Sequence, residues 1–223
     1  VYKRQAQGLM IEVRHVEDKD NYDESFLELV VPSGASIAAE GVSADITISG
    51  SRGESVSAQS VSGDMSVEAE SGRLELSSVS GDIDFEGSSS RSSVESVSGD
   101  VDLDGVSGEV TISTVSGDVE LAAGAVSEGS LDTVSGTLDL EMSVEDGGKV
   151  TVECMNGDVR LRLPESQTGS FSAQSFSGDI NTVLGDVKQE KYGPGSHFKH
   201  VTGDSGTVIR VESFSGDIHI GHK

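Results

Sequence analysis

Short segments in which apolar and polar residues alternate recur along most of the chain. Val101 and Leu103, for example, alternate with Asp102 and Asp104. The same alternation occurs at 83–86, 110–113, 119–121, 138–141 and 218–220. Because successive side chains of a strand point to opposite faces, each segment predicts a short strand with one buried and one solvated face.

A four-residue motif, Val-Ser-Gly-Asp or Phe-Ser-Gly-Asp, precedes many of these segments. It begins at Val61, Val79, Val97, Val115, Phe176 and Phe214. Variants of it begin at Val42, Val106, Val134, Met155 and Val201. Glycine accepts positive φ, and Ser and Asp side chains bond nearby backbone groups, so the motif predicts a turn.

The motif recurs with a regular period. Apart from Val106, which marks a half-period, successive starts from Val42 to Phe176 lie 18 to 21 residues apart. A strand this short cannot bury its apolar face alone, whereas stacked repeats form a continuous core. The period therefore predicts an all-β fold, a β-solenoid (single-stranded and β-helix-like) of about 19-residue coils with two short strands per coil. The alternative is an antiparallel β meander or sandwich, in which each motif closes a hairpin.

The ends of the chain differ from the repeats. We expect residues 1–10 to be a leader remnant or disordered, and residues 11–40 to form N-terminal capping strands, with 11–16 and 26–31 as a strand pair. Residues 41–223 form the predicted repeat array. A gap of 38 residues separates Phe176 from Phe214 and contains Tyr-Gly-Pro-Gly at 192–195, which predicts a loop insertion at about 184–200.

Composition narrows the function. The 223 residues carry a net charge of −24, which disfavours binding to nucleic acid. No apolar run approaches the ~18–20 residues that span a bilayer, so we expect no transmembrane segment.

The single Cys154 excludes an internal disulfide and is in phase with inward-facing Val150 and Val152. No G-x-S-x-G, Walker or G-x-G-x-x-G motif is present, so we predict a non-enzymatic protein with no catalytic residues and no cofactor.

An aspartate ends most copies of the motif. These residues are Asp64, Asp82, Asp100, Asp118, Asp158, Asp179 and Asp217. The favoured interpretation is a turn carboxylate that accepts backbone N–H groups. The alternative is a calcium-binding ladder, but the second glycine-rich half of such repeats is missing, which leaves weak divalent-cation binding open. The histidine pairs at 197/200 and 219/222 lack acidic or Cys partners at ligand spacing, so no metal site is predicted.

One basic segment interrupts the acidic chain. Its candidate partner-binding residues are Lys188, Lys191, Tyr192, His197, Phe198, Lys199 and His200. Such a segment either contacts an anionic surface, glycan or protein, or offsets the charge of neighbouring acidic coils. Outside it, Arg160 and Arg162 are expected to point outward and pair with acids on adjacent coils.

Together, the repeats, the lead-in Val31-Pro-Ser-Gly-Ala-Ser36 and the late Tyr-Gly-Pro-Gly resemble the bacterial adhesin-labelled family with β-strand repeats, domain of unknown function 4097. The resemblance covers about residues 25–220. It implies a β-solenoid-like fold and a periplasmic, secreted or cell-envelope location. It implies no catalytic residues, because none are attached to the family.

The sequence thus predicts a non-enzymatic bacterial envelope or extracellular β-repeat protein. Its role would be that of an adhesin or scaffold that binds a surface, glycan or protein partner. The alternatives are a glycan-active β-helix enzyme and a Ca²⁺-dependent repeat module.

Overall fold

The computed structural model describes residues 2–5, 8–11, 27–189 and 195–223, which belong to two compact units. In the first unit, residues 1–31, strand β1 (Tyr2–Gln5) pairs with β2 (Gly8–Ile11) in antiparallel fashion. The second unit, residues 32–223, is a β-solenoid that contains no helix in its described residues. Among all residues described, no helix is long and apolar enough to span a membrane.

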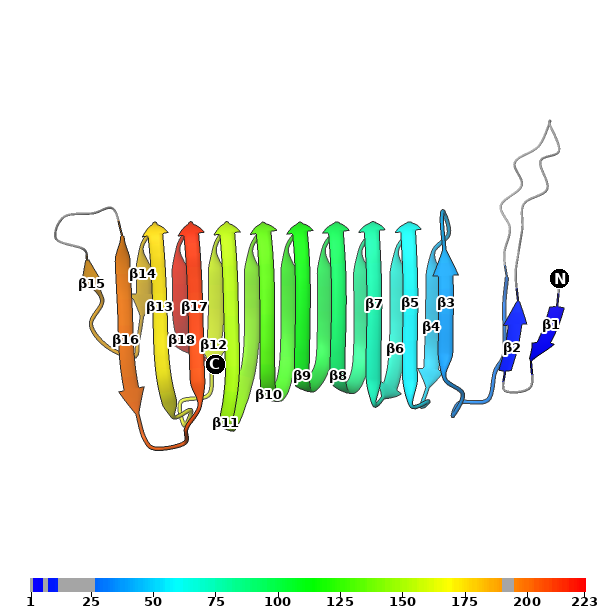
Figure 1. The fold of residues 1–223 in the computed structure, drawn as a ribbon, viewed down its shortest axis with the longest axis horizontal. Helices are drawn as coiled ribbons and strands as arrows, with labels where there is room; N and C mark the ends of the chain where they lie inside the picture. The colour runs from blue at the N-terminus through cyan, green and yellow to red at the C-terminus, as the bar shows by residue number, and fades with distance from the viewer. Residues whose placement is uncertain (1, 6–7, 12–26, 190–194) are drawn as a thin grey trace. The chain divides into compact units, whose positions relative to one another are not determined.

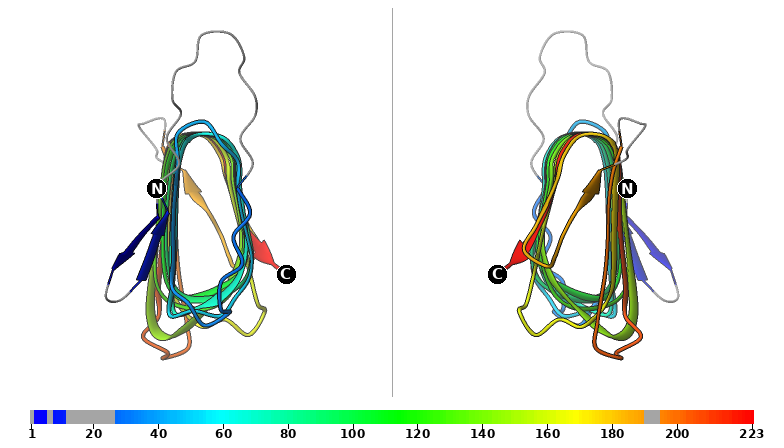
Figure 2. Two further views of the ribbon diagram at one scale, coloured as in Figure 1. Left: turned by 90° about the vertical axis from the view of Figure 1, so that its right-hand side faces the viewer. Right: turned by 90° about the vertical axis from the view of Figure 1, so that its left-hand side faces the viewer.

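The solenoid has two faces of stacked strands (Figure 1). The first face contains, in spatial order from one end, β3 (Ile37–Gly41), β5 (Ser55–Ser62), β7 (Arg73–Ser80), halves of four long strands, then β17 (Val208–Ser215), β13 (Gly169–Ser177) and β16 (Ser196–Thr202). The second face contains β4 (Ile46–Ser51), β6 (Met65–Ser71), the other halves of the long strands, then β12 (Val159–Leu163), β18 (Ile218–His222) and β14 (Ile180–Thr182). The long strands are β8 (Ile83–Ser98), β9 (Val101–Ser116), β10 (Val119–Ser135) and β11 (Leu138–Asn156). Seen along the stack, the coils superimpose as one flattened loop (Figure 2).

Neighbouring coils pair in parallel and place like residues on like. Val119 and Leu121 of β10 lie beside Val101 and Leu103 of β9, for example. These side chains are at most 1% exposed and contribute to one continuous core between the two faces. The predicted β-solenoid is therefore confirmed, and the antiparallel meander is wrong for the coils.

The long strands differ from the two short strands expected in each coil. Strand β9 runs for 16 residues and bends at Gly105, where φ is +90°. A Cβ on Gly105 would collide with the carbonyl oxygen of Gly87 in the preceding coil. Pairing between β8 and β9 continues past this bend with register shifts. The half-period corner is thus a bulged, bent strand instead of a turn that ends pairing.

The C-terminal coil is stacked out of sequence order. Strand β17 lies between β11 and β13, and β18 lies between β12 and β14 (Figure 1). After β12 the chain passes over one level of the stack and forms the next coil with β13 and β14. The C-terminal strands β17 and β18 then occupy the level between them. The sequence does not predict this order, because every coil carries the same local motif and the motif does not encode its neighbours.

The predicted insertion at about 184–200 is partly a capping strand. Strand β16 pairs with β13 in antiparallel fashion, and β15 (Lys188–Gln189) pairs with β16. An antiparallel strand at this position covers the parallel edge of β13. At the other end, the expected strand at 26–31 is absent from its described residues 27–31, and the first strand of the solenoid begins at Ile37. Pro32 directly after this segment removes a backbone donor that a strand would use.

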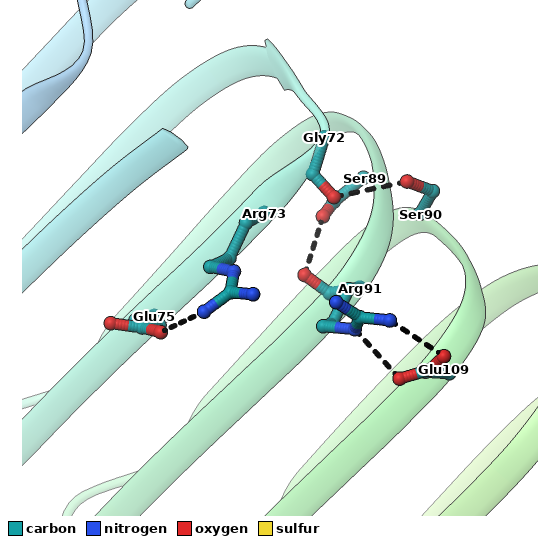
Figure 3. Close-up of polar contacts among 7 residues, drawn as sticks. All are labelled: Gly72, Arg73, Glu75, Ser89, Ser90, Arg91 and Glu109. Atoms are coloured by element: carbon teal, nitrogen blue, oxygen red, sulfur yellow. Dashed lines mark hydrogen bonds and ion pairs between the residues drawn. The ribbon is translucent and has the colours of Figure 1, made fainter. Parts of the chain in front are cut away.

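Ion pairs join adjacent coils on the outward faces. Arg91 donates two hydrogen bonds to Glu109 one coil away, at 2.6 and 2.8 Å (Figure 3). The bond to Arg91 lowers the pKa of Glu109 below its ordinary value. Arg162 pairs with Asp139 of the adjacent coil at 2.6 Å, as expected. Arg160 also points outward, as expected, but its ion pair is with Asp158 of its own coil, at 3.8 Å, and not with an acid of an adjacent coil.

Candidate binding surfaces

The motif aspartates form a column along one corner of the solenoid. In this column a carboxylate Oδ1 accepts the backbone N–H of the residue at the same position one coil away, over 2.7–3.0 Å. The pairs are Asp45 with Asp64, Asp64 with Asp82, Asp82 with Asp100, Asp100 with Asp118, Asp118 with Thr137, Asp158 with Asp217, and Asp217 with Asp179. The turn-carboxylate interpretation is confirmed, with one refinement: the N–H belongs to the neighbouring coil and not to the same turn.

The same contacts bear on the calcium interpretation. The Oδ1 of each accepting aspartate is already bonded to an amide N–H of the neighbouring coil, which leaves that oxygen less available to a cation. Across residues 27–189 and 195–223, no group of three or more His, Cys, Asp or Glu side chains is placed to hold a metal ion. Repulsion along the acidic face is nevertheless present, because burial and then Asp102, Asp82 and Asp64 raise the pKa of Asp84.

A second column of small hydroxyl or thiol side chains lies directly beneath the corner. Its buried members are Ser60, Ser78, Ser96, Thr114, Thr133, Cys154, Ser213 and Ser175. The Ser78 hydroxyl donates to the carbonyl oxygen of Gly81 at 3.0 Å, and the Cys154 thiol donates to that of Gly157 at 3.3 Å. Burial, followed by the charge of Asp158, raises the pKa of Cys154. Cys154 is therefore a packed thiol that helps to close its turn, as its phase predicted.

The first residue of each motif points outward, except for Val106 of the half-period copy, which is buried. The sequence did not predict this outward orientation. These residues form an exposed apolar column, with side chains 44–71% exposed, that contains Val42, Val61, Val79, Val97, Val115, Val134, Met155, Phe214 and Phe176 in spatial order. Alternation along the preceding strand gave the available signal. If Val110 and Ile112 point inward, so does Thr114, and Val115 must then point outward.

The column becomes larger and more aromatic toward the C-terminal end. Phe214 and Phe176 stack with ring centroids 5.0 Å apart and an interplanar angle of 8°. They border an open groove of about 530 Å³ together with Val134 and Met155. We call these four residues and the space beside them the apolar groove.

The apolar groove has an acidic and polar opposite wall. Asp132, Glu153, Glu212 and Gln174 line it, two positions before each apolar residue. Thr133, Cys154 and Ser213 of the buried column also line it, between the two walls. The groove therefore crosses β10, β11, β17 and β13 along the stacking direction, perpendicular to the strands.

The structure separates the predicted basic binding residues. Lys188 and Lys199 are exposed and His197 is half-buried, with Lys188 and His197 paired across β15 and β16. Phe198 is 3% exposed and belongs to the core, so it offers no surface for stacking. Its ring instead stacks on half-buried His200, at a centroid distance of 6.2 Å.

Two predicted residues, Lys191 and Tyr192, lie outside the described residues. Of the described residues of this segment, half-buried His197 adjoins the apolar groove, because it pairs in register with Gln174 of the polar wall. The sequence thus pointed to the correct end of the solenoid but not to the groove.

Fold and corner geometry define a class: a parallel β-solenoid whose repeats stack on columns of glycine, aspartate and exposed apolar side chains. The chain belongs to the Toastrack DUF4097 family, a domain of unknown function, whose sequence profile matches residues 10–221. Comparison with curated proteins and with solved structures found no match.

Proposed function

We propose that the protein is a non-enzymatic binding scaffold of the bacterial cell envelope, of adhesin or scaffold type, that holds a protein or glycan partner in the apolar groove. The observation that carries this proposal is the exposure of Met155, Phe176 and Phe214, at 54%, 50% and 57%, side by side on a continuously paired sheet. Large apolar side chains that gather on a surface, rimmed by polar groups, are typical of interaction sites. The envelope location rests on the family resemblance.

The groove suits binding better than chemistry. Its exposed ionisable residues are acids spaced one coil apart, and its one thiol, Cys154, is buried with a raised pKa, which disfavours the nucleophilic thiolate. The groove is open along its length, whereas catalytic sites exclude water around a few convergent polar groups. A rigid wall of register-matched strands instead presents a fixed contact surface at low entropic cost.

A photo-crosslinking experiment tests the proposal in the source bacterium. The full-length protein carries p-benzoylphenylalanine in place of Met155, or in place of Asp102, an exposed residue on the second face, as the control. We expect light-dependent adducts from position 155 and none from position 102, in the envelope fraction. An absence of adducts at position 155, or a protein confined to the cytosol, would contradict the proposal.

The non-enzymatic part has its own test. The purified protein is incubated with a panel of polysaccharides, and binding and released reducing ends are measured together. We expect no release of reducing ends. Any hydrolysis would contradict the scaffold proposal and support a glycan-active enzyme. Hydrolysis that persists in a variant with both Glu153→Gln and Asp132→Asn would show that the active site lies outside the groove.

A further inference from the structure

The direction of the apolar groove limits what can lie in it. Its apolar wall contains one side chain per coil, in the order Val134, Met155, Phe214, Phe176, and adjacent parallel strands lie ~4.8 Å apart. A ligand segment that follows the groove therefore meets equivalent positions every ~4.8 Å, or every ~9.6 Å at alternate coils.

Only one common backbone conformation matches this spacing. Polyproline II repeats every three residues at a rise of ~3.1 Å, or ~9.3 Å per turn, which is close to two coil spacings. An extended β-strand repeats its side chains on one face every ~6.7 Å, and an α-helix turns every ~5.4 Å, so both lose register with the coils. A polyproline II segment keeps one face against Val134 and Phe214, or against Met155 and Phe176.

The side chains that line the groove also suit proline. Grooves that bind polyproline II segments are lined by aromatic side chains, on which proline rings pack. The stacked Phe214 and Phe176 form such a surface, and Met155 extends it with a flexible, polarisable side chain. Because a proline-rich segment is already extended before it binds, little conformational entropy is lost on docking.

The charge of the groove selects a basic partner. Asp132 and Glu153 are exposed on the polar wall, while Glu212 is paired with Arg210 at 3.4 Å. The protein carries 39 acids against 15 Lys and Arg. A second copy of this chain would therefore bring like charges together, whereas Lys or Arg beside the prolines would complement the wall.

We propose that the apolar groove binds a proline-rich protein segment in the polyproline II conformation that carries Lys or Arg next to its prolines. This inference rests on the proposed function and names the class of partner. The four groove positions span about 14 Å, which corresponds to about five residues of such a segment.

Fluorescence anisotropy with defined peptides tests the inference. The probe is a labelled peptide of sequence RPPLPPLPR, and the control peptide is RSSLSSLSR, which keeps the charges and leucines but not the polyproline II preference. The groove variant is Met155→Ser with Phe214→Ser. The matched variant is Val61→Ser with Val79→Ser, which removes exposed residues of the same column far from the groove. Thermal melting verifies that both variants remain folded.

We expect the proline peptide to bind the parent protein and the Val61/Val79 variant with equal affinity. Its affinity for the groove variant should be lower by about tenfold or more, as for the loss of an interface anchor. The serine peptide should bind about tenfold more weakly than the proline peptide. Raising NaCl from about 50 mM to about 300 mM, or changing Glu153 to Gln, should weaken binding of the proline peptide.

Equal binding of both peptides, or equal loss in both variants, would overturn the inference and indicate nonspecific attraction to an acidic surface. A parent protein that sediments as a dimer, with a monomeric groove variant, would overturn it in favour of a second copy. If the proline peptide does not bind but crosslinked adducts form at position 155, this inference is overturned and the proposed function stands. If no adducts form, the proposed function itself is refuted.

Discussion

Asp158 accepts the backbone N–H of Asp217 at 3.0 Å, although 59 residues separate them in the chain. At the same corner, Asp217 accepts the N–H of Asp179, which precedes it by 38 residues. Both contacts exist because the C-terminal coil fills a gap between two earlier coils. The position of the C-terminal coil also brings Phe214 beside Phe176, so the candidate binding groove depends on the strand that ends at Ser215.

Removal of the Asp158 carboxylate should weaken this junction. Asp158→Ala leaves the Asp217 N–H without its acceptor, which should lower the free energy of unfolding by about 1 kcal/mol. Asp158→Asn keeps an oxygen acceptor and loses only an exposed ion pair with Arg160, so it should cost little. Urea denaturation measures both, with Asp104→Ala as a control at an exposed acid. Equal destabilisation by Ala and Asn would contradict the capping role.

Much of this fold follows from local pattern. Alternation places Val101 and Leu103 inward and Asp102 outward, and the glycine-containing motif places the corner. Both signals are local, so the sequence alone supports the solenoid and the exposed face. The order of stacking is not local, because the coils at Phe176 and Phe214 carry the same Phe-Ser-Gly-Asp motif and either could follow Met155.

The groove was missed for a different reason. The alternation within each strand predicts that apolar residues point inward and acidic residues point outward. Val115 and its equivalents are instead apolar and exposed. Thr114 takes the inward position before the turn, and Gly117, at φ +131°, resets the phase after it. In the basic segment, charge alone could not show that Phe198 is a core residue, because its burial depends on the pairing of β16 with β13.

Inward and outward positions of the same type of strand should differ strongly in tolerance. Leu121 is 1% exposed, so Leu121→Asp would bury a charge and should cost several kcal/mol, about 3–5. Asp102 is exposed, and Asp102→Asn should be close to neutral. Chemical denaturation monitored by circular dichroism compares the two. Similar losses at both positions would refute the assignment of faces.

The motif glycines, which lie against one another in neighbouring coils, should not accept a side chain. Gly117 has φ +131°, and its added Cβ would collide with the carbonyl oxygen of Gly99 in the neighbouring coil. Gly117→Ala should therefore destabilise the protein by about 2 kcal/mol or more. Gly34→Ala is the matched control, because no atom lies within 4 Å of its added Cβ. An equal fall in melting temperature in both variants would show that close contact between glycines of neighbouring coils is not required for stability.

Calcium should act on this protein only as a screening cation. The Oδ1 of Asp100 already accepts the N–H of Asp118, and its neighbours repeat the arrangement. We expect CaCl₂ and MgCl₂ to raise the melting temperature by similar small amounts, with no gain of β signal by circular dichroism. A large calcium-specific gain would instead support the Ca²⁺-dependent repeat module.

Repulsion along the second face should make stability depend on pH at Asp84. Burial, then the charges of Asp102, Asp82 and Asp64, raises the folded-state pKa of Asp84 above its ordinary value. The folded protein therefore holds this proton more tightly than the unfolded chain. The favourable contribution of protonated Asp84 is present below its ordinary pKa, near 3.9, and is lost as pH rises through the folded-state pKa.

Asp84→Asn should accordingly stabilise the protein at about pH 7, where the parent carboxylate is charged, and should give no gain at about pH 3. Because Asp84 is mostly solvated, the gain should be only a few tenths of a kcal/mol. Asp186→Asn is the control, since it removes one charge from an exposed loop outside this face. Urea denaturation at both pH values measures the difference. If the two variants gain equally at pH 7, the change in net charge and not the local repulsion at Asp84 is responsible.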